Sequence, residues 1–268
     1  MNTVVVVGAS SGIGLACALH LAHRGHRVFA TSRTPPPEGP FEYVPMDVTS
    51  EGSVEHAVSV ILDRAGHIDA VVNSAGFGYA GAVEDTSLAE AQRQFDTNFF
   101  GALRVLRATL PHLRATKGRL IHISSIGGHI ALPFQGLYCA SKFALEGLSE
   151  ALSHELHGSG VQVVLVEPGD FRTGFTDNRK LVHAAGADSP SSYRSQFERT
   201  LAVFIADEQR GPEPLDVARV VHHALEVTRP RLRYVVGMPL QRWSIALKKI
   251  FPWRVFAWVL RKIYKIAG

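Results

Sequence analysis

The stretch TVVVVGASSGIG, residues 3–14, runs from β-branched residues directly into a glycine-rich turn. Thr3–Val7 has the composition of a strand that is buried on both faces. Leucines at positions 15, 19 and 21 continue in a helical pattern after the turn. This order predicts a dinucleotide phosphate site, because glycines at positions 8, 12 and 14 let the backbone approach a pyrophosphate at a helix N-terminus. A plain tight turn is the alternative.

Strands and helices are expected to alternate along most of the chain. Strand-like runs lie at residues 27–31, near 43–44, and at 69–72, 120–123 and 161–166. Helical patterns lie between them at residues 50–66, opened by serine caps at 50 and 53, and at 89–115, and another begins at residue 138. This alternation predicts one α/β Rossmann fold, a doubly wound, mostly parallel sheet of about seven strands with helices on both faces. Its ligand crevice would lie beyond the carboxyl ends of the strands.

The residue after the second strand bears on the choice of dinucleotide. An NAD site usually has an acidic side chain here to hold the ribose 2′-hydroxyl, whereas this chain has Arg33 after Ser32. Because the planar guanidinium binds phosphate oxygens and neutralises their charge, Arg33 favours a 2′-phosphate and therefore NADP(H), with Ser11 as a second contact. An ordinary exposed arginine is the alternative.

The segment YCASK, residues 138–142, places a phenol and an ammonium four residues apart in the first turn of an expected helix. At that spacing Tyr138 and Lys142 share one helix face, and a nearby cation lowers a tyrosine pKa toward the range useful for acid–base catalysis. The pair alone also occurs by chance on surface helices. Ser125 follows another strand at the same sheet edge and could hydrogen-bond a carbonyl oxygen that Tyr138 protonates. Together they predict reduction of a C=O group beside a nicotinamide.

Several features of the sequence indicate the class of substrate and the cellular compartment. The apolar segment 127–134 between Ser125 and Tyr138 suggests a lipophilic ketone or aldehyde. Cys17 and Cys139 are far apart, which favours a reducing, cytoplasmic setting and leaves Cys139 a packing role. We expect no signal peptide, because a strand begins by Thr3. We also expect no metal site, because the histidines lack ligand spacing and are assigned packing or surface roles: His112, His122, His154, His222 and His223.

The last thirty residues, 239–268, combine basic and aromatic side chains, and no acidic residue follows Glu226. The pattern predicts an amphipathic helix with Trp253, Phe256 and Leu260 on its apolar stripe. Such a helix could dock on its own domain, lie peripherally on a membrane, close the active site or pack on a partner subunit. Nucleic acid is not an expected partner, because the positive charge is mixed with large apolar residues.

These motifs resemble the short-chain dehydrogenase/reductase family, and the resemblance covers most of the chain. It rests on the glycine turn, the segment NSAG at residues 73–76, the Tyr-x-x-x-Lys pair and the segment PGDFRT at residues 168–173. The segments GFGYAG (residues 76–81) and Asp170-Phe171 look like the steroid and retinol branch. Val7 and Ser74 depart from the family's usual threonine and asparagine, so one hydrogen bond at the end of the first strand is expected to be absent.

The resemblance implies a role for each residue of a catalytic tetrad. Tyr138 would be the acid/base and Ser125 the donor that orients the carbonyl. Lys142 would bind the nicotinamide ribose and lower the tyrosine pKa, and Asn98 would hold a water of the proton relay. The implied cofactor contacts include Tyr138 and Lys142 and add the following residues: Gly8, Ser10, Ser11, Gly12, Ile13, Gly14, Arg33, Asp47, Val48, Asn73, Ala75, Gly76, Pro168, Gly169, Phe171 and Thr173.

The resemblance also implies an organisation and partners. Residues 1–238 would form the catalytic NADP-binding domain, with a substrate lid at about 172–209 that is interrupted at Gly186, Ser189 and Pro190. Residues 239–268 would be an extension. Two functions follow, an NADP(H)-dependent oxidoreductase for lipophilic carbonyls or a dinucleotide sensor without turnover, and the presence of both Tyr138 and Lys142 favours the enzyme. Pairing through the helices that carry Asn98 and Tyr138 implies a homodimer or homotetramer.

Overall fold

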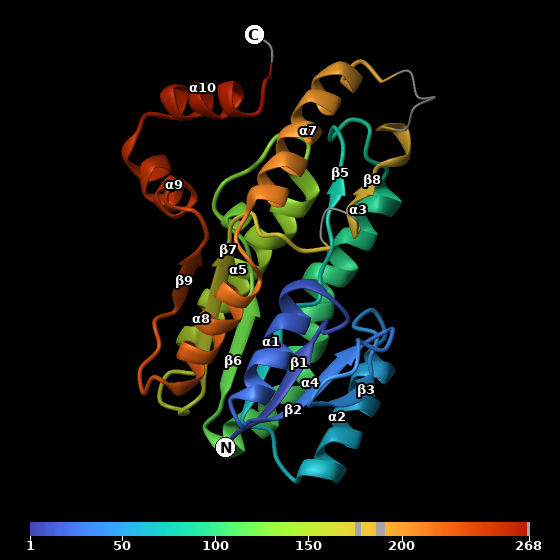
Figure 1. The fold of residues 1–268 in the computed structure, drawn as a ribbon, viewed down its shortest axis with the longest axis vertical. Coiled ribbons are helices and arrows are strands. Elements are labelled where there is room, and N and C mark those ends of the chain that lie inside the picture. Colours follow the sequence, from blue (N-terminus) through green and yellow to red (C-terminus); the bar gives the residue numbers. More distant parts are fainter. Residues whose placement is uncertain (175–177, 186–190, 267–268) are drawn as a thin grey trace.

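The protein is an α/β sandwich in which helices cover both faces of a parallel sheet (Figure 1). The computed structural model describes residues 1–174, 178–185 and 191–266. The seven strands of the main sheet follow the order β3-β2-β1-β4-β6-β7-β9, and neighbouring strands are parallel. This confirms the predicted doubly wound fold. The strands are β1 Thr3–Val7, β2 Arg27–Ser32, β3 Glu42–Pro45, β4 Ala70–Asn73, β6 Arg119–Ile123, β7 Gln162–Pro168 and β9 Arg233–Val236.

Alternate residues of each strand face two separate cores, as the two-residue period of a strand requires. Val4 and Val6 of β1 pack in one core with α1 (Gly12–His23) and α8 (Leu215–Glu226). Val5 and Val7 pack in the other core with α2 (Glu51–Ala65), α4 (Gly101–Thr116) and α5 (Gly136–Glu155). The strands therefore carry apolar side chains on both faces, which explains why their sequences are continuous runs of β-branched residues.

Two predicted elements differ in detail. The single helix expected over residues 89–115 is instead α3 (Leu88–Phe95), a π-helical turn η1 (Asp96–Phe100) and α4. Asn98 lies in that π turn, and such turns inside helices are frequent at functional sites. In α1 the buried face is Cys17, Ala18 and Leu21, while Leu15 and Leu19 are half-buried.

The segment expected to act as a lid adds a second, small sheet. Its strand β8 (Lys180–Leu181) pairs in parallel with β5 (Tyr79–Ala80), beside the turn that follows β4. A short 3-10 turn η3 (His183–Ala185) and α7 (Arg194–Arg210) follow. The backbone N–H of His183 donates to Glu90 in the first turn of α3. The predicted interruption at residues 186, 189 and 190 lies outside the described residues.

The tail forms two helices, α9 (Pro239–Ile250) and α10 (Trp253–Ile263), rather than one. Figure 1 shows them beside β9 and α7, at the end of the molecule toward which β6 and β7 point. Among the described residues, Phe256 is the buried side chain of α10. Phe251 ends α9 and Pro252 caps α10, so the pair Phe-Pro marks the break between them.

The turn after β1 depends on glycine for two separate reasons. Gly8 has φ +82°, which side chains rarely adopt, and a Cβ there would lie 2.7 Å from backbone atoms of Ala75. A Cβ on Gly14 would lie 2.1 Å from the carbonyl oxygen of Gly8. The start of α1 can therefore pack closely against β1 only if glycines stand at these positions.

Comparing Gly8→Ala with Gly25→Ala separates the cost of a positive φ from the cost of a steric clash. Gly25 has a similar φ of +85° but its Cβ would meet nothing within 4 Å. We expect Gly25→Ala to lower the free energy of unfolding by about 1 kcal/mol, and Gly8→Ala by roughly 3 kcal/mol because a steric clash is added. Urea unfolding followed by circular dichroism measures both, and equal losses in the two variants would contradict this account.

Candidate active site

Residues distant in the chain meet around the glycine turn at the carboxyl edge of the sheet. The backbone N–H groups of Gly8 and Ala9 both donate to the carbonyl of Thr31, at distances of 2.8 and 3.0 Å, which ties the turn to β2. A Cβ on Gly12 would lie 3.5 Å from Cβ of Thr173. The predicted cofactor contacts of residues 8–14 and Thr173 are thus neighbours. A cradle of glycine backbone at a helix N-terminus fits the pyrophosphate of a dinucleotide.

The turn after β4 is joined to β1 through the backbone. The N–H of Ser74 donates to the carbonyl of Val7 at 2.9 Å, so the two strand ends are tied together although Val7 replaces threonine. The Asn73 amide nitrogen lies 3.4 Å from Nδ1 of buried His122 on the neighbouring strand β6. Ala75 packs against Gly8, and Gly76 is exposed at the edge. The predicted cofactor turn therefore lies beside the glycine turn.

Arg33 and Asp47 follow two neighbouring strands at the same edge. Arg33 is exposed, one residue beyond β2. Burial acts to raise the pKa of Asp47, but hydrogen bonds from Thr49 and the charges of Arg33 and Arg104 outweigh it and lower that pKa. Asp47 is therefore ionised at neutral pH and close enough to Arg33 to be affected by its charge.

Three members of the predicted tetrad, Ser125, Tyr138 and Lys142, meet where β6, β7 and α5 come together. Tyr138 and Lys142 are buried on one face of the first turns of α5, and Nζ of Lys142 lies 5.9 Å from the centroid of the tyrosine ring. Nζ donates a 2.9 Å hydrogen bond to the carbonyl of Ile123 at the end of β6. Ser125 hydrogen-bonds Tyr138 and accepts a 3.0 Å bond from the N–H of Gly127.

Asn98 is fixed by a set of hydrogen bonds rather than by direct contact with Tyr138. Its amide nitrogen donates to the carbonyl of Phe77 at 2.9 Å and to Oγ of Ser141 at 3.1 Å, and its oxygen accepts from the N–H of Phe77. A Cβ on Gly76 would lie 3.3 Å from that oxygen and 3.8 Å from Nζ of Lys142. Asn98 therefore borders the space between Gly76 and Lys142.

The pKa of Tyr138 differs from the sequence prediction. Burial raises it, and the hydrogen bond with Ser125 opposes this only in part. Burial also lowers the pKa of Lys142 to about 8, against an opposing effect of Glu146. The expectation that the cation lowers the tyrosine pKa is therefore not met in this structure, because transfer of the phenol out of water outweighs the lowering effect of its hydrogen bond with Ser125.

The wall beside these groups is apolar. Ile126 and Ile130 are buried, and Phe134 is half-buried. Phe134 has φ +59°, an uncommon value for a bulky residue. Its carbonyl accepts a 2.9 Å bond from the N–H of Gly81, and its ring lies 5.6 Å from that of Phe197 on α7. The lid segment and the wall are thus in contact, and a strained backbone at a wall residue is typical of a functional position.

The tail contributes residues to the site that the sequence analysis did not foresee. Gln241 of α9 donates to the carboxylate of Asp170 at 2.5 Å and accepts from the backbone N–H of Asp170 at 3.2 Å. A Cβ on Gly169 would lie 2.1 Å from Oε1 of Gln241. The carbonyl of Tyr264 accepts a 2.8 Å bond from Thr200 of α7. The apolar stripe of the tail indicated that the tail could pack on another surface, but it did not indicate which residues the tail would contact.

Two predicted cofactor contacts are placed differently from their neighbours. The side chain of Phe171 is buried in the core with α1 and α8 rather than exposed in the crevice. Val48 is buried and packs against Gly101, while its carbonyl accepts from Arg104. Pro168 ends β7, and its carbonyl lies 3.4 Å from Oγ of Ser125.

Cys139 and His122 have the environments of packing residues. Burial raises the pKa of the Cys139 thiol to about 11, and its Sγ accepts from the N–H of Leu132. Burial and the charge of Lys142 lower the pKa of His122 to about 4. A protonated thiol and a neutral imidazole fit the roles predicted for them.

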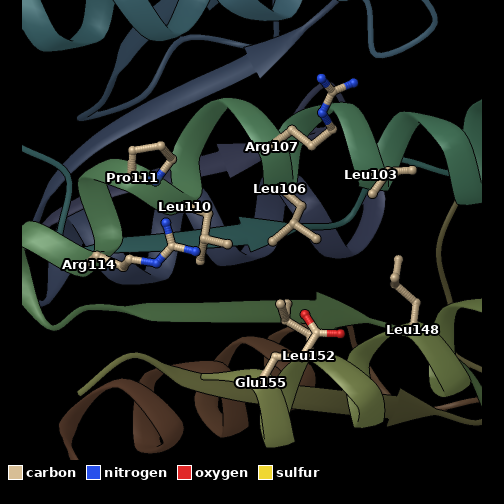
Figure 2. A pocket seen from close by; sticks show the side chains of 9 residues that line it. All are labelled: Leu103, Leu106, Arg107, Leu110, Pro111, Arg114, Leu148, Leu152 and Glu155. Atoms are coloured by element: carbon tan, nitrogen blue, oxygen red, sulfur yellow. The ribbon is translucent and has the colours of Figure 1, made fainter. Parts of the chain in front are cut away.

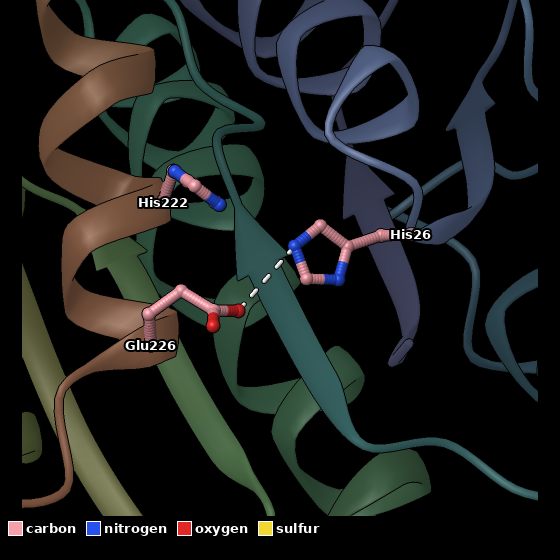
Figure 3. A group of neighbouring side chains, drawn as sticks. All are labelled: His26, His222 and Glu226. Carbon is pink, nitrogen blue, oxygen red and sulfur yellow. Dashed lines mark ion pairs between the residues drawn. The ribbon is translucent and has the colours of Figure 1, made fainter.

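Three potential ligands nevertheless come together elsewhere, which the histidine spacing did not indicate. His26, just before β2, faces His222 and Glu226, one helical turn apart on α8 (Figure 3). Their donor atoms lie within 4.8 Å of one another. Nδ1 of His26 accepts from the N–H of Asn2 at 3.4 Å, which leaves the proton on Nε2, 3.6 Å from Glu226. We therefore interpret this group as a contact between α8 and the segment before β2, at the amino edge of the sheet.

An open groove lies on the opposite side of the sheet from α1, between α4 and α5. Figure 2 shows its lining, with leucines of both helices at its floor and charged side chains at its rim. Its volume is about 370 Å³. The residues that line it are Leu103, Leu106, Arg107, Leu110, Pro111, Arg114, Leu148, Leu152 and Glu155.

Asp170 should make stability depend on pH. Burial and the carboxylates of Glu208 and Asp207 raise its pKa to about 7, against about 3.9 in an unfolded chain. Between these values the unfolded chain loses the proton that the folded protein keeps, so stability falls as pH rises from 4 to 7. Relative to wild type, we expect Asp170→Asn to be more stable at pH 8 than at pH 4 by about 4 kcal/mol, since the two pKa values differ by about three units. Urea unfolding at both pH values measures this, and a difference that does not change with pH would contradict it.

Comparison with known proteins agrees with this geometry. A family model described as short chain dehydrogenase matches residues 2–182. The chain is 39% identical over 265 residues to 3-ketodihydrosphingosine reductase of Bacteroides thetaiotaomicron, with 98% of each chain covered. It is 35% identical over 253 residues to retinol dehydrogenase 8 of Homo sapiens, covering 87% of this chain and 80% of that protein. The crystal structure of a short-chain dehydrogenase from Streptomyces avermitilis has a TM-score of 0.80 at 28% identity and covers 99% of both chains. The chain belongs to the short-chain dehydrogenase family, and it is an oxidoreductase of that family.

Proposed function

We propose that this oxidoreductase interconverts a lipophilic ketone or aldehyde and its alcohol, with NADP(H) as cofactor. The observation that carries the proposal is the meeting of Ser125, Tyr138 and Lys142 beside the glycine cradle, at the carboxyl edge of the sheet. The Ser125–Tyr138 hydrogen bond places two hydroxyl groups where one carbonyl oxygen could contact both. The apolar wall around Phe134 supports a lipophilic substrate.

In this proposal each side chain has one task. NADPH, when bound, supplies a hydride to the carbonyl carbon. Oγ of Ser125 orients the carbonyl oxygen, and the phenol of Tyr138 gives that oxygen its proton, so that the ketone becomes an alcohol. Because burial raises the pKa of Tyr138, the phenol carries its proton at neutral pH and can donate it to a substrate oxygen. The buried ammonium of Lys142 stabilises the phenolate that remains.

The names of two relatives support a more specific substrate class. Relatives named for 3-ketodihydrosphingosine and for retinol share the chemistry of a long apolar body with an oxygen function near one end. We propose a long-chain ketone of this kind as the substrate, with 3-ketodihydrosphingosine as the first compound to test. The identity to the Bacteroides reductase extends over almost the whole chain, including the tail.

A dinucleotide sensor is the second function considered. Such a protein would need the cofactor crevice but not the proton donor. Tyr138 and Lys142 are both present and buried side by side, which favours turnover over sensing.

The first test is replacement of the proton donor. We expect Tyr138→Phe to lower kcat for a long-chain ketone by about 10²–10⁴-fold, because the ring remains but its acidic proton is lost. The matched control is Tyr234→Phe on the edge strand β9, whose hydroxyl accepts only a backbone bond from Arg231 among the described contacts. NADPH consumption measures both variants. Unchanged turnover in Tyr138→Phe would mean that another group supplies the proton.

The cofactor preference is tested separately at Arg33. We expect Arg33→Asp to invert the ratio of NADPH to NADH affinity, because an acidic group repels a 2′-phosphate and accepts from a ribose 2′-hydroxyl. Arg24→Asp is the matched control, since Arg24 is also exposed but ends α1 at the opposite edge of the sheet. Fluorescence titration with both cofactors measures the ratio, and a ratio that stays at the wild-type value in Arg33→Asp would remove the argument.

We also propose that two copies pair through α4 and α5. The groove between these helices has leucines at its floor and arginines opposite a glutamate at its rim, which suits a self-complementary contact. The division into a catalytic domain of residues 1–238, a lid and an extension of residues 239–268, and a cytoplasmic location, remain predictions.

A further inference from the structure

We propose that the outer side of α9 and α10 is a docking surface for an anionic lipid bilayer, on which these helices lie. The tail surface is defined here as the exposed side chains of residues 239–266. This binding does not depend on the reaction that the enzyme catalyses.

All three tryptophans of the chain lie on the tail surface. Trp243, Trp253 and Trp258 are 66, 67 and 57% exposed. Six other large apolar side chains are exposed with them: Leu240, Ile250, Phe251, Val255, Val259 and Ile263. Large apolar side chains gathered in this way usually mark an interaction site, and tryptophan in particular favours the boundary between water and lipid.

The charge of the tail surface has a single sign. Seven basic residues and no acidic residue occur after position 238: Arg242, Lys248, Lys249, Arg254, Arg261, Lys262 and Lys265. The whole chain carries only +4, so the remainder of the protein has a net negative charge. An anionic surface would therefore attract the tail and repel the rest of the molecule, which fixes the orientation of approach.

The inner side of the tail is held firmly against the catalytic domain. Phe256 is buried, and the ring of Tyr264 packs 4.9 Å from that of Phe204 on α7. Nζ of Lys248 donates to the carbonyl of His129. Because these contacts orient both helices, the tryptophans and most of the cations are left outward on a preformed surface.

The geometry indicates a helix that lies on a bilayer rather than one that crosses it. Within residues 1–174, 178–185 and 191–266, no helix is long and apolar enough to span a membrane. Short amphipathic helices with aromatic residues and many cations bind in the plane of the interface.

Two other occupants fit the tail surface less well. A second copy would bring the six exposed cations of the tail surface against six identical cations, which repel each other. A nucleic acid would satisfy the cations but would leave the large apolar side chains without burial. Lipid provides both anionic headgroups and an apolar layer beneath them.

The tail surface adjoins the proposed active site. Gln241 of α9 contacts Gly169 and Asp170, and Lys248 contacts the loop between Ser125 and Tyr138. If the proposed function is correct, docking would bring the substrate entrance to the lipid that holds a long-chain substrate. This last step, unlike the binding itself, rests on the proposed function.

The chain offers a direct readout, because its only tryptophans are on the tail surface. We expect tryptophan emission of the full chain to move to shorter wavelength when vesicles of phosphatidylglycerol and phosphatidylcholine are added. Brominated acyl chains in the same vesicles should quench it. Vesicles of phosphatidylcholine alone, or raised salt, should weaken the effect, because exposed charges are screened.

Matched charge variants test the electrostatic part by vesicle sedimentation. We expect Lys249→Glu, Arg254→Glu and Lys262→Glu together to lower binding to anionic vesicles at least about tenfold. The control carries the same charge change at the opposite end of the molecule, Arg24→Glu, Arg229→Glu and Arg231→Glu, and should keep most of the binding. Circular dichroism checks that both variants are folded.

Two results would overturn the proposal. One is wild-type protein that neither sediments with anionic vesicles nor changes its emission. The other is equal loss of binding in both charge variants, which would mean that net charge alone and not the tail surface governs binding. Emission that is already short-wavelength without lipid, together with a dimer that the tail variant dissociates, would identify a second copy as the occupant and would also refute it.

Discussion

The buried ammonium of Lys142 is the constraint on which the arrangement of the site depends. Removing this cation from water is costly, and the structure compensates with the carbonyl of Ile123 at the end of β6. That bond fixes α5 relative to the sheet and thereby sets where Tyr138 stands. This carbonyl can accept the bond from Lys142 because Ile123 is the last residue of β6, where the hydrogen bonds between neighbouring strands end. The carbonyl oxygen of Ile123 therefore connects the end of a sheet strand to the position of the proposed catalytic side chains.

Other parts of the structure position residues of the site at the same carboxyl edge of the sheet. The π turn η1 turns Asn98 toward Phe77 and Ser141, which closes the space next to Lys142. The glycine turn brings β1, β2 and the segment after β4 together. The apolar wall then packs on α7 through the ring contact of Phe134 with Phe197. Each element on its own is common, and it is their convergence at the strand ends that makes a site.

Much of this could be predicted because the signals are local. Residues 3–14 combine a β-branched run with glycines whose positions are sterically required, and residues 138–142 place two functional groups within one turn of helix. Strand β9 was not located, because its four half-buried residues lack a continuous apolar run. The π turn, Gln241 and Tyr264 were missed because they depend on contacts between segments far apart in the sequence. The pKa of Tyr138 was predicted with the wrong sign because burial depth is not visible in a spacing pattern.

The most direct test of the account is transfer of a labelled hydride. The full-length protein would be incubated with NADPH deuterated at the transferable position and with 3-ketodihydrosphingosine or a simple long-chain ketone, and the products examined by mass spectrometry. The account predicts an alcohol with one deuterium on the carbinol carbon. Tight binding of NADPH without deuterium in any product, across long-chain ketones and aldehydes, would contradict it.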